Sequence, residues 1–470
     1  MTGDRQRVRD RSRSTPDPLT RRALLRGSAL ALAGAVAGCQ GAPTSDDPGS
    51  DMPPNSQTRT QTAASPNATA TRVPTATPLP SPTLRTGETP TDTRTPTPEP
   101  PDELFVAPDG APGGAGTRGE PLASLSTALD RAGPGTTVLL RDGTFRPTRT
   151  LGARGLAGTP AEPVAVDAVP GANPVFDFGA ASVGGLRFSD CRHLVLCGFG
   201  VRDAPSRGLF VEDGSSDVLV EDVSVRGTGG DSNAGGSGVF VLASTDVTLR
   251  RVDSQNNYDP SSGGGNADGI DVERSPGTLL EGCVARGNSD DGIDLWQTTE
   301  TTLRDCWAFD NGFDPNGNEA GDGDGFKLGG GTDSGDNRVE RCVAFDNLAR
   351  GFDDNGATRP VTLYNCTSWR NPVSFRLGCT IPDGGDNCPA HRLRNNLHAD
   401  GRVVLARSVD AAFNSWDYGF GSPGFAGTDR SDPAFLHLAA DSPAVDAGVD
   451  VGLPYRGMAP DLGAFEFRGR

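Results

Sequence analysis

One short segment recurs along the chain, as Asp268-Gly269-Ile270-Asp271-Val272, Asp291-Gly292-Ile293-Asp294-Leu295 and Asp324-Gly325-Phe326-Lys327-Leu328. Its glycine returns in further copies, so that six glycines follow one another at steps of 23 to 33 residues, at Gly208, Gly238, Gly269, Gly292, Gly325 and Gly351. Steps of this length, filled with short apolar stretches and turn residues and without sustained helical periodicity, are typical of a β-solenoid. We therefore predict an all-β fold, a single-stranded parallel β-helix.

A second apolar segment repeats between these copies. Its anchors are Leu249, Leu280, Leu303, Val339 and Leu363. Three residues after each anchor stands a small apolar residue, and eight residues after it an asparagine: Val252, Cys283, Cys306, Cys342 and Cys366, then Asn257, Asn288, Asn311, Asn347 and Asn371. We expect the first set to stack inside the solenoid as small hydrophobic residues. We expect the asparagines to form a ladder at a turn, where their side-chain amides bond along the stack.

The composition of the chain argues against some classes of function. The chain has 470 residues, a formal net charge of −18 and 64 glycines. Nucleic-acid binding needs a basic face, so this acidity argues against a nucleic-acid partner. Lys327 is the only lysine, since the other basic residues are arginine. Strong acidity with scarce lysine would suit a halophilic source, because high salt screens self-repulsion.

The first 103 residues read as targeting and spacer segments. Residues 20–26 carry a twin-arginine pattern, and the apolar run that follows is too short to span a bilayer. Residues 36–39 resemble a lipobox ending at Cys39, which would become the lipidated first residue; the alternative is an ordinary cleaved signal. Residues 40–103 are rich in Thr and Pro and are expected to form a disordered stalk. We thus expect an extracellular protein, anchored at the cell surface or secreted by the twin-arginine route, touching the membrane only through a lipid.

The remaining segment, residues 104–467, is expected to be one β-helical catalytic domain and a monomer. A short helix near residues 125–132 should cap its N-terminal end, and residues 442–465 resemble a closing strand and cap. Cys379 and Cys388 flank a loop and could form a disulfide or remain free. The four histidines are scattered and are interpreted as structural or surface residues.

An acidic cluster is predicted on the outer face. Side chains alternate along a strand, so the residue between the two core positions of each copy points outward. This places Phe210, Phe240, Asp271, Asp294, Lys327 and Asp353 in one column, while Asp268, Asp291 and Asp324 form a second column before the glycines. Carboxylates one coil apart, at the ~4.8 Å strand spacing, repel one another unless a cation such as Ca²⁺ joins them. A solvated acidic face is the alternative, because Asp-Gly pairs are also ordinary turn residues.

The single lysine favours a chemical role. A structural cation could have been arginine, whereas lysine can lose its proton in a suitable environment. With these residues in place, residues 266–269, 288–295 and 325–330 resemble the motifs of family 9 polysaccharide lyases, which are pectate lyases on a right-handed parallel β-helix. The resemblance covers about residues 104–467 and is strongest over 255–375.

The resemblance implies a set of roles. Calcium would be bound by Asp268, Asp290, Asp291 and Asp294, and Lys327 would be the Brønsted base in the β-elimination of an acidic polysaccharide such as polygalacturonate. Arg350 and Arg376 are weaker candidates for holding substrate carboxylates. The sequence departs from the family pattern at three positions, Asp271, Asp322 and Asp324, where extra acid could alter metal or substrate binding.

Two other functions stay open on the sequence. A glycoside hydrolase on the same fold would need an acid and a base flanking the bond and no lysine. A non-catalytic carbohydrate-binding surface protein would also use a solenoid face. An ultraviolet-absorbing unsaturated product would identify a lyase, and a binding protein would tolerate Lys327→Arg.

Overall fold

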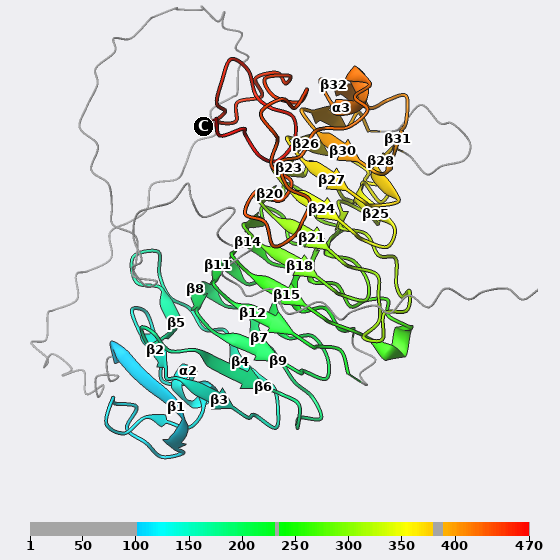
Figure 1. Ribbon diagram of the computed structural model, residues 1–470. Coiled ribbons are helices and arrows are strands. Elements are labelled where there is room, and N and C mark those ends of the chain that lie inside the picture. Colours follow the sequence, from blue (N-terminus) through cyan, green and yellow to red (C-terminus); the bar gives the residue numbers. More distant parts are fainter. Residues whose placement is uncertain (1–100, 231–234, 379–388, 470) are drawn as a thin grey trace, which may run out of the picture. The chain divides into compact units, whose positions relative to one another are not determined.

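The computed structural model describes residues 101–230, 235–378 and 389–469. Within them the chain winds into successive coils, each contributing one strand to each of three parallel sheets (Figure 1). The prediction of a right-handed parallel β-helix is confirmed. Residues 379 and 388, whose cysteines could form a disulfide or remain free, lie outside the described residues. So do the twin-arginine segment, the lipidation site at residue 39 and most of the expected stalk.

Sheet 1 is the longest and lies along one side of every coil. Its strands, in order, are β1 (Glu103–Ala111), β2 (Thr137–Leu140), β5 (Val164–Ala168), β8 (Arg192–Cys197), β11 (Ser216–Glu221), β14 (Thr245–Arg250), β17 (Leu279–Glu281), β20 (Thr302–Arg304), β23 (Arg338–Glu340), β26 (Thr362–Tyr364), β29 (Arg392–Arg394) and β32 (Asp410–Ala412).

Sheet 2 follows sheet 1 in each coil and consists of short strands. They are β3 (Gly143–Phe145), β6 (Pro174–Asp177), β9 (Gly200–Arg202), β12 (Ser224–Arg226), β15 (Asp253–Gln255), β18 (Val284–Arg286), β21 (Trp307–Phe309), β24 (Val343–Phe345), β27 (Thr367–Trp369) and β30 (Leu397–Ala399).

Sheet 3 completes each coil and carries the recurring Gly-x-x-x segment. Its strands are β4 (Leu151–Arg154), β7 (Leu186–Ser189), β10 (Leu209–Glu212), β13 (Val239–Leu242), β16 (Ile270–Glu273), β19 (Ile293–Trp296), β22 (Phe326–Lys327), β25 (Arg350–Asp353), β28 (Val373–Leu377) and β31 (Arg402–Leu405). Short helices are α2 (Leu125–Leu129), η2 (Pro260–Ser262) and α3 (Ser415–Tyr418).

The interior consists of aligned columns, as predicted. Val252 and the cysteines of the repeat are fully buried, and the cysteines are free thiols. The asparagine ladder is also present: Asn257 donates to Asn288, Asn288 to Asn311, and Asn311 to Asn347, each through Nδ2 to Oδ1 at 2.8–2.9 Å. Each asparagine also accepts a backbone N–H from the preceding coil, which would otherwise be a buried unpaired donor.

The recurring glycines are required by close packing between coils. A Cβ atom at Gly292 would lie 2.5 Å from the carbonyl oxygen of Gly325 and 2.8 Å from the Cβ of Ala308. Gly269 meets Gly292 and Ala285 in the same way, at 2.6 and 2.7 Å. Because nothing larger fits at these positions, strands of sheet 3 enter every coil at the same point and stay in register.

The two ends of the solenoid are covered differently. Helix α2 buries Leu125 and Leu129 over the first coil, as the sequence predicted for a capping helix. At the other end Trp416 of α3 packs on the core, with its ring 5.3 Å from that of Phe375.

The prediction of a closing strand in residues 442–465 is wrong. No strand occurs there, and the C-terminal segment instead runs back along the outside of sheet 2 (Figure 1). Phe435 packs against the outward rings of Trp307, Phe345 and Trp369. Arg430 fixes the segment by ion pairs to Asp310 and Asp346. The segment serves as a cover for an aromatic surface, so it needs apolar contacts rather than strand pairing.

Among the described residues, no helix is long and apolar enough to cross a membrane.

Candidate active site

The acidic column lies in the turns that lead from sheet 2 into sheet 3. Asp268 Oδ1 accepts the backbone N–H of Asp291 at 3.1 Å, and Asp291 Oδ1 accepts the N–H of Asp324 at 2.6 Å. Each carboxylate therefore bonds to the backbone one coil further along, which aligns the column along the solenoid axis. Asp290 is held by two backbone N–H groups, of Asn266 at 2.6 Å and of Asp322 at 2.7 Å.

The outward column of sheet 3 completes the cluster. Asp271, Asp294 and Lys327 are Cα partners in neighbouring strands β16, β19 and β22. The Lys327 Nζ donates to Asp291 Oδ2 at 2.8 Å and to Asp322 Oδ2 at 2.9 Å, and it lies 3.7 Å from Asp294 Oδ2. The sequence thus placed the lysine correctly beside the acids.

The four aspartates predicted to bind calcium are buried. Their exposed fractions lie between 0% for Asp291 and 9% for Asp294. Ligand oxygens of Asp268, Asp291 and Asp294 lie within 4.8 Å of one another, and so do those of Asp290, Asp291 and Asp322. Asp294 Oδ1 is buried without a hydrogen-bond partner. Convergent carboxylate oxygens with an unpaired buried acceptor match the oxygen ligands that Ca²⁺ prefers, so these residues fit the cation that the sequence led us to expect.

In the absence of a cation, burial and mutual repulsion make the charged form of these carboxylates unfavourable. Burial, reinforced by the neighbouring carboxylates, raises the pKa of Asp268 well above its usual range. Burial also raises the pKa of Asp291 to about 7, although the Lys327 charge works in the opposite direction. For Lys327, burial would lower the pKa, but the charges of Asp294, Asp291 and Asp268 outweigh it and raise the pKa strongly. Without a cation, the lysine is therefore an ammonium ion.

The three departures from the family pattern occupy different environments. Asp322 lies on the loop before β22 with a 65% exposed side chain, and its hydrogen bond with Lys327 lowers its pKa. Burial raises the pKa of Asp271 to about 7 and that of Asp324 to about 8. The bond from Lys327 to Asp322 was not foreseen from the sequence, because Asp322 stands in an irregular loop that does not repeat.

Arg350 and Arg376 lie on the C-terminal side of the cluster and are bonded to aspartates of this chain. The Arg350 Nη1 contacts Asp324 at 3.0 Å and Asp353 at 3.1 Å, and Arg376 Nη1 contacts both oxygens of Asp353 at 2.8 and 3.0 Å. Their role in holding substrate stays a prediction, and the charge of each is already balanced within the protein.

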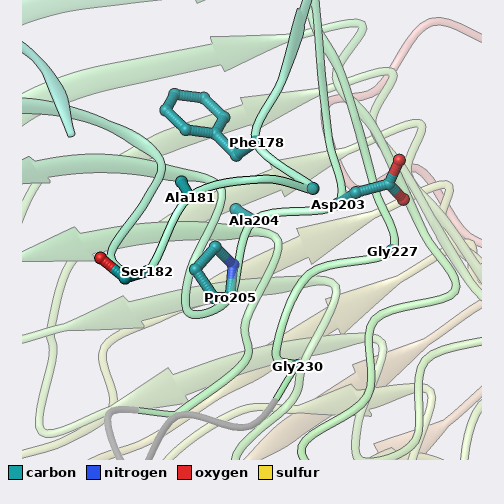
Figure 2. Close-up of a pocket in the computed structure, with 9 residues that line it drawn as sticks. Phe178, Ala181, Ser182, Asp203, Ala204, Pro205, Gly227 and Gly230 are labelled. Carbon is teal, nitrogen blue, oxygen red and sulfur yellow. The ribbon is translucent and has the colours of Figure 1, made fainter. Parts of the chain in front are cut away.

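A separate hollow lies on the N-terminal side of the cluster, among the loops that follow β6, β9 and β12, the last of which is one coil before the turn that carries Asp268. It has a volume of about 500 Å³, and its walls include Phe178, Ala181, Ala204 and Pro205 (Figure 2). Among the described residues that line it, Asp203 is the only charged one. These described lining residues therefore do not offer the chemistry of the aspartate and lysine cluster.

Comparisons with known proteins agree with this fold. A family model described as Pel9A-like, right-handed β-helix region, matches residues 104–396. The chain is 32% identical to pectate lyase L of Dickeya chrysanthemi over 77% of its own length and 90% of the relative, and 29% identical to pectate lyase PEL9 of Emericella nidulans over 67% and 83%. The crystal structure of pectate lyase Pel9A superposes with a TM-score of 0.65 at 31% identity, covering 78% of this chain and 96% of that one. A rhamnogalacturonan lyase shares the fold, with a TM-score of 0.64 at 21% identity.

Proposed function

Because the chain belongs to the Pel9A-like β-helix family, and is therefore a polysaccharide lyase of the pectate lyase family, we propose that it cleaves a polyuronate by calcium-dependent β-elimination with Lys327 as the base. The observation that carries the proposal is the contact of the single lysine of the chain with Asp291 and Asp322, inside a cluster of carboxylates from neighbouring coils.

The cation would be held by Asp268, Asp290, Asp291 and Asp294. When bound there, Ca²⁺ would offset two of the negative charges of the four acids and the substrate carboxylate, and so stabilise the negative charge that develops beside that carboxylate. The fit rests on the convergent oxygens and on the unpaired Asp294 Oδ1.

Lys327 would remove the proton from C5 of the uronate. In the elimination, the C5–H bond breaks and its proton passes to Nζ, a double bond forms between C4 and C5, and the C4–O bond breaks. The leaving oxygen takes a proton from solvent and becomes part of a new reducing end. Lys327 must be neutral to accept the proton. The neighbouring carboxylates raise its pKa, so a bound cation that offsets part of their charge would lower that pKa and favour this step.

Asp291 and Asp322 would orient the base. Their bonds to Nζ, at 2.8 and 2.9 Å, fix the end of a flexible side chain in the outward column. A positioned proton acceptor of this kind contributes about 10²–10⁴-fold to rate.

The decisive experiment follows polygalacturonate by ultraviolet absorbance. We expect an unsaturated product with calcium, loss of activity with a chelator and recovery on adding calcium back, and at least a 10²-fold lower rate for Lys327→Ala. Arg392→Ala, an exposed arginine on sheet 1, is the matched control and should keep full activity. Reducing ends without the absorbing product would indicate a hydrolase, and binding without any cleavage would indicate a carbohydrate-binding protein; either result would overturn the proposal.

We also propose that the protein is exported by the twin-arginine route and held at the cell surface through a lipid on Cys39, on the basis of the residue 20–39 pattern. In the native host, Cys39→Ser should move the protein from the membrane fraction to the medium. A wild-type protein found in the medium alone would contradict the anchor.

A further inference from the structure

An exposed indole lies on the strand that carries Asp294. Side chains alternate along β19, so Trp296, two residues after Asp294, points outward on the same face of sheet 3, ~7 Å away along the strand. Trp296 is 38% exposed. A single exposed hydrophobic residue is ordinary on a protein surface, so its surroundings must show whether it has a role.

The next coil is shaped to receive this ring. A Cβ atom at Gly330 would lie 2.5 Å from the indole atoms Cε3 and Cζ3, and 2.7 Å from Asn355 Nδ2. Glycine at this position therefore lets the ring rest on the backbone of the coil that carries Lys327. Asn355 Nδ2 donates to the carbonyl oxygen of Gly329 at 3.0 Å, which holds the amide at the same place. The indole is thus supported by the protein while part of it stays open to solvent beside the candidate base.

The side chains that follow Lys327 along sheet 3 form a set of ion pairs. Asp353 is the Cα partner of Lys327, and Arg376 is the Cα partner of Asp353. Arg376 Nη1 contacts both oxygens of Asp353, at 2.8 and 3.0 Å. Arg350 Nη1 contacts Asp353 at 3.1 Å and Asp324 at 3.0 Å. Two arginines are therefore balanced by two aspartates whose side chains are at most 2% exposed.

This set of ion pairs favours an uncharged sugar over a uronate. A carboxylate that came to the two arginines would meet charges that are already offset, and it would add a third negative charge to those of Asp324 and Asp353. An uncharged sugar instead offers hydroxyl groups, which accept hydrogen bonds from the remaining guanidinium N–H groups. Val404, the Cα partner of Arg376, is 46% exposed and continues this column with an apolar side chain.

We propose that Trp296, Arg350 and Arg376 form a subsite for an uncharged sugar residue on the C-terminal side of Lys327, and that Asp353 sets this preference. The apolar face of the sugar ring would lie on the indole. Two residues share this chemistry, a neutral sugar and a uronate methyl ester. The inference rests on the proposed function and adds to it that the preferred substrate is a polyuronate interrupted by uncharged residues, while a continuous polyuronate binds less tightly.

The first test removes the charge of Asp353 and measures binding by calorimetry in the Lys327→Ala background, with calcium, so that no substrate is consumed. Asp353→Asn keeps an acceptor for the N–H of Asn355 but leaves Arg376 without its counter-charge. We expect a fully charged galacturonate oligomer to bind about tenfold more tightly, because a charge-assisted hydrogen bond contributes on the order of one factor of ten. An oligomer of the same length that alternates uronate with a neutral sugar should change less than about twofold.

Asp410→Asn is the matched control for this change. It removes the carboxylate that pairs with Arg392 and Arg394 on sheet 1, and it should leave the binding of both oligomers as in the parent protein. Asp353→Ser removes the same charge as Asp353→Asn and should shift the ratio of the two affinities in the same direction, which guards against misfolding of one variant. An unchanged ratio in the folded variant would overturn the role of Asp353.

The second test removes the indole. We expect Trp296→Ala to weaken binding of the alternating oligomer about tenfold, and Trp296→Phe, which keeps an aromatic face, to recover most of this loss. Tyr455→Ala, at a 41% exposed residue of the C-terminal segment, is the control and should bind like the parent protein. Equal affinity of Trp296→Ala and the parent protein would overturn the stacking surface.

A partly methyl-esterified galacturonate oligomer identifies the source of the uncharged residue. Tighter binding of this oligomer than of the alternating one would assign the subsite to uronate esters, and the reverse order would assign it to neutral sugars. A parent protein that binds the fully charged oligomer more tightly than both others would overturn the preference while leaving the lyase intact. A parent protein that binds none of the three, and a wild type that cleaves none, would instead remove the proposed function itself.

Discussion

Lys327 is held between acids that favour its charged form. The charges of Asp294, Asp291 and Asp268 raise its pKa despite burial, and its bonds to Asp291 and Asp322 fix Nζ in the outward column. An arginine could make comparable ion pairs at this position but could not give up a proton. Lysine rather than arginine at this position therefore favours a role as a base over a role as a structural cation.

Lys327→Arg should therefore fold but not turn over. We expect a rate at least 10²-fold below wild type, because a guanidinium cannot accept a proton at any working pH. Circular dichroism and the melting temperature should stay close to wild type, because the ion pairs remain possible. A rate within tenfold of wild type would show that the base lies elsewhere.

The aspartate cluster predicts opposite effects of pH on the calcium-free and calcium-bound protein. Burial raises the pKa of Asp271 and of Asp291 to about 7, from an ordinary value of 3.8. Between these values the folded state holds more protons than the unfolded state, so stability falls as pH rises. The raised pKa of Lys327 affects stability only above the ordinary lysine pKa of 10.5, so it does not offset this loss between pH 5 and pH 8.

In chelator, we accordingly expect the melting temperature to decrease by several degrees from pH 5 to pH 8. Calcium should reverse this decrease, and its stabilising effect should be largest at pH 8, where the ligands are deprotonated. Calorimetric scans at both pH values check the prediction. Asp291→Asn is the informative variant, since it should reduce both the pH effect and the calcium effect; equal calcium effects at pH 5 and pH 8 would contradict it.

At the scale of single residues, the sequence identified the residues that repeat but missed contacts made from irregular loops. Asp268, Asp291 and Lys327 were found because they stand at fixed offsets from recurring glycines. The contact of Asp322 with Lys327 could not be found in this way, because a loop of irregular length carries it.

Among the elements, the strands of sheet 2 are only three to four residues long, and their stability depends on the columns between coils. The asparagine ladder and the glycine column meet at each turn into sheet 3. A Cβ at Gly292 would lie 2.8 Å from Asn311 Nδ2, so the ladder itself excludes a side chain at that position. The repeat period predicted both columns. It did not explain why the recurring residue is glycine; the packing shows that close approach between coils, and not turn geometry, is the reason.

Asn311→Ala should destabilise the protein by about 2–3 kcal/mol. The substitution removes the acceptor of both the backbone N–H and Nδ2 of Asn288, and it removes a donor to the carbonyl oxygen of Ala285. Chemical denaturation measures the change. Asn316→Ala, in an exposed loop, is the matched control and should change stability by less than about 0.5 kcal/mol. A loss as small as the control would show that the ladder is only a geometric coincidence.

In the molecule as a whole, the C-terminal segment covers sheet 2 while the site lies on sheet 3 and the turns before it. The sequence predicted the cap at the N-terminal end but mistook the C-terminal segment for a strand. Residues 442–465 carry no periodic signal for their true position, because their contacts are with residues far away in sequence, such as that of Phe465 with the ring of Trp307.

Phe435→Ala should loosen this cover without affecting catalysis. We expect a loss of about 3 kcal/mol, because the buried ring touches three other aromatic side chains. The melting temperature should fall, and the rate on polygalacturonate at 25 °C should stay near wild type. Met458→Ala, at an 89% exposed residue, is the control. A large loss of rate in Phe435→Ala would mean that the cover also shapes the site.

The strands of sheet 3 keep the same register at their recurring glycines. Differences in length between coils are therefore confined to the turns. The turn before β19 has six residues, 287–292, whereas the turn before β22 has sixteen, 310–325, yet both strands begin in the same register. The strands of the solenoid therefore fix the positions of the reactive groups, whatever the length of the loops that surround them. Descendants of such a chain can acquire new sugar preferences by swapping whole loops, and an engineer can graft a foreign loop between residues 313 and 319, beyond the asparagine ladder, while the strand that carries the base keeps its place.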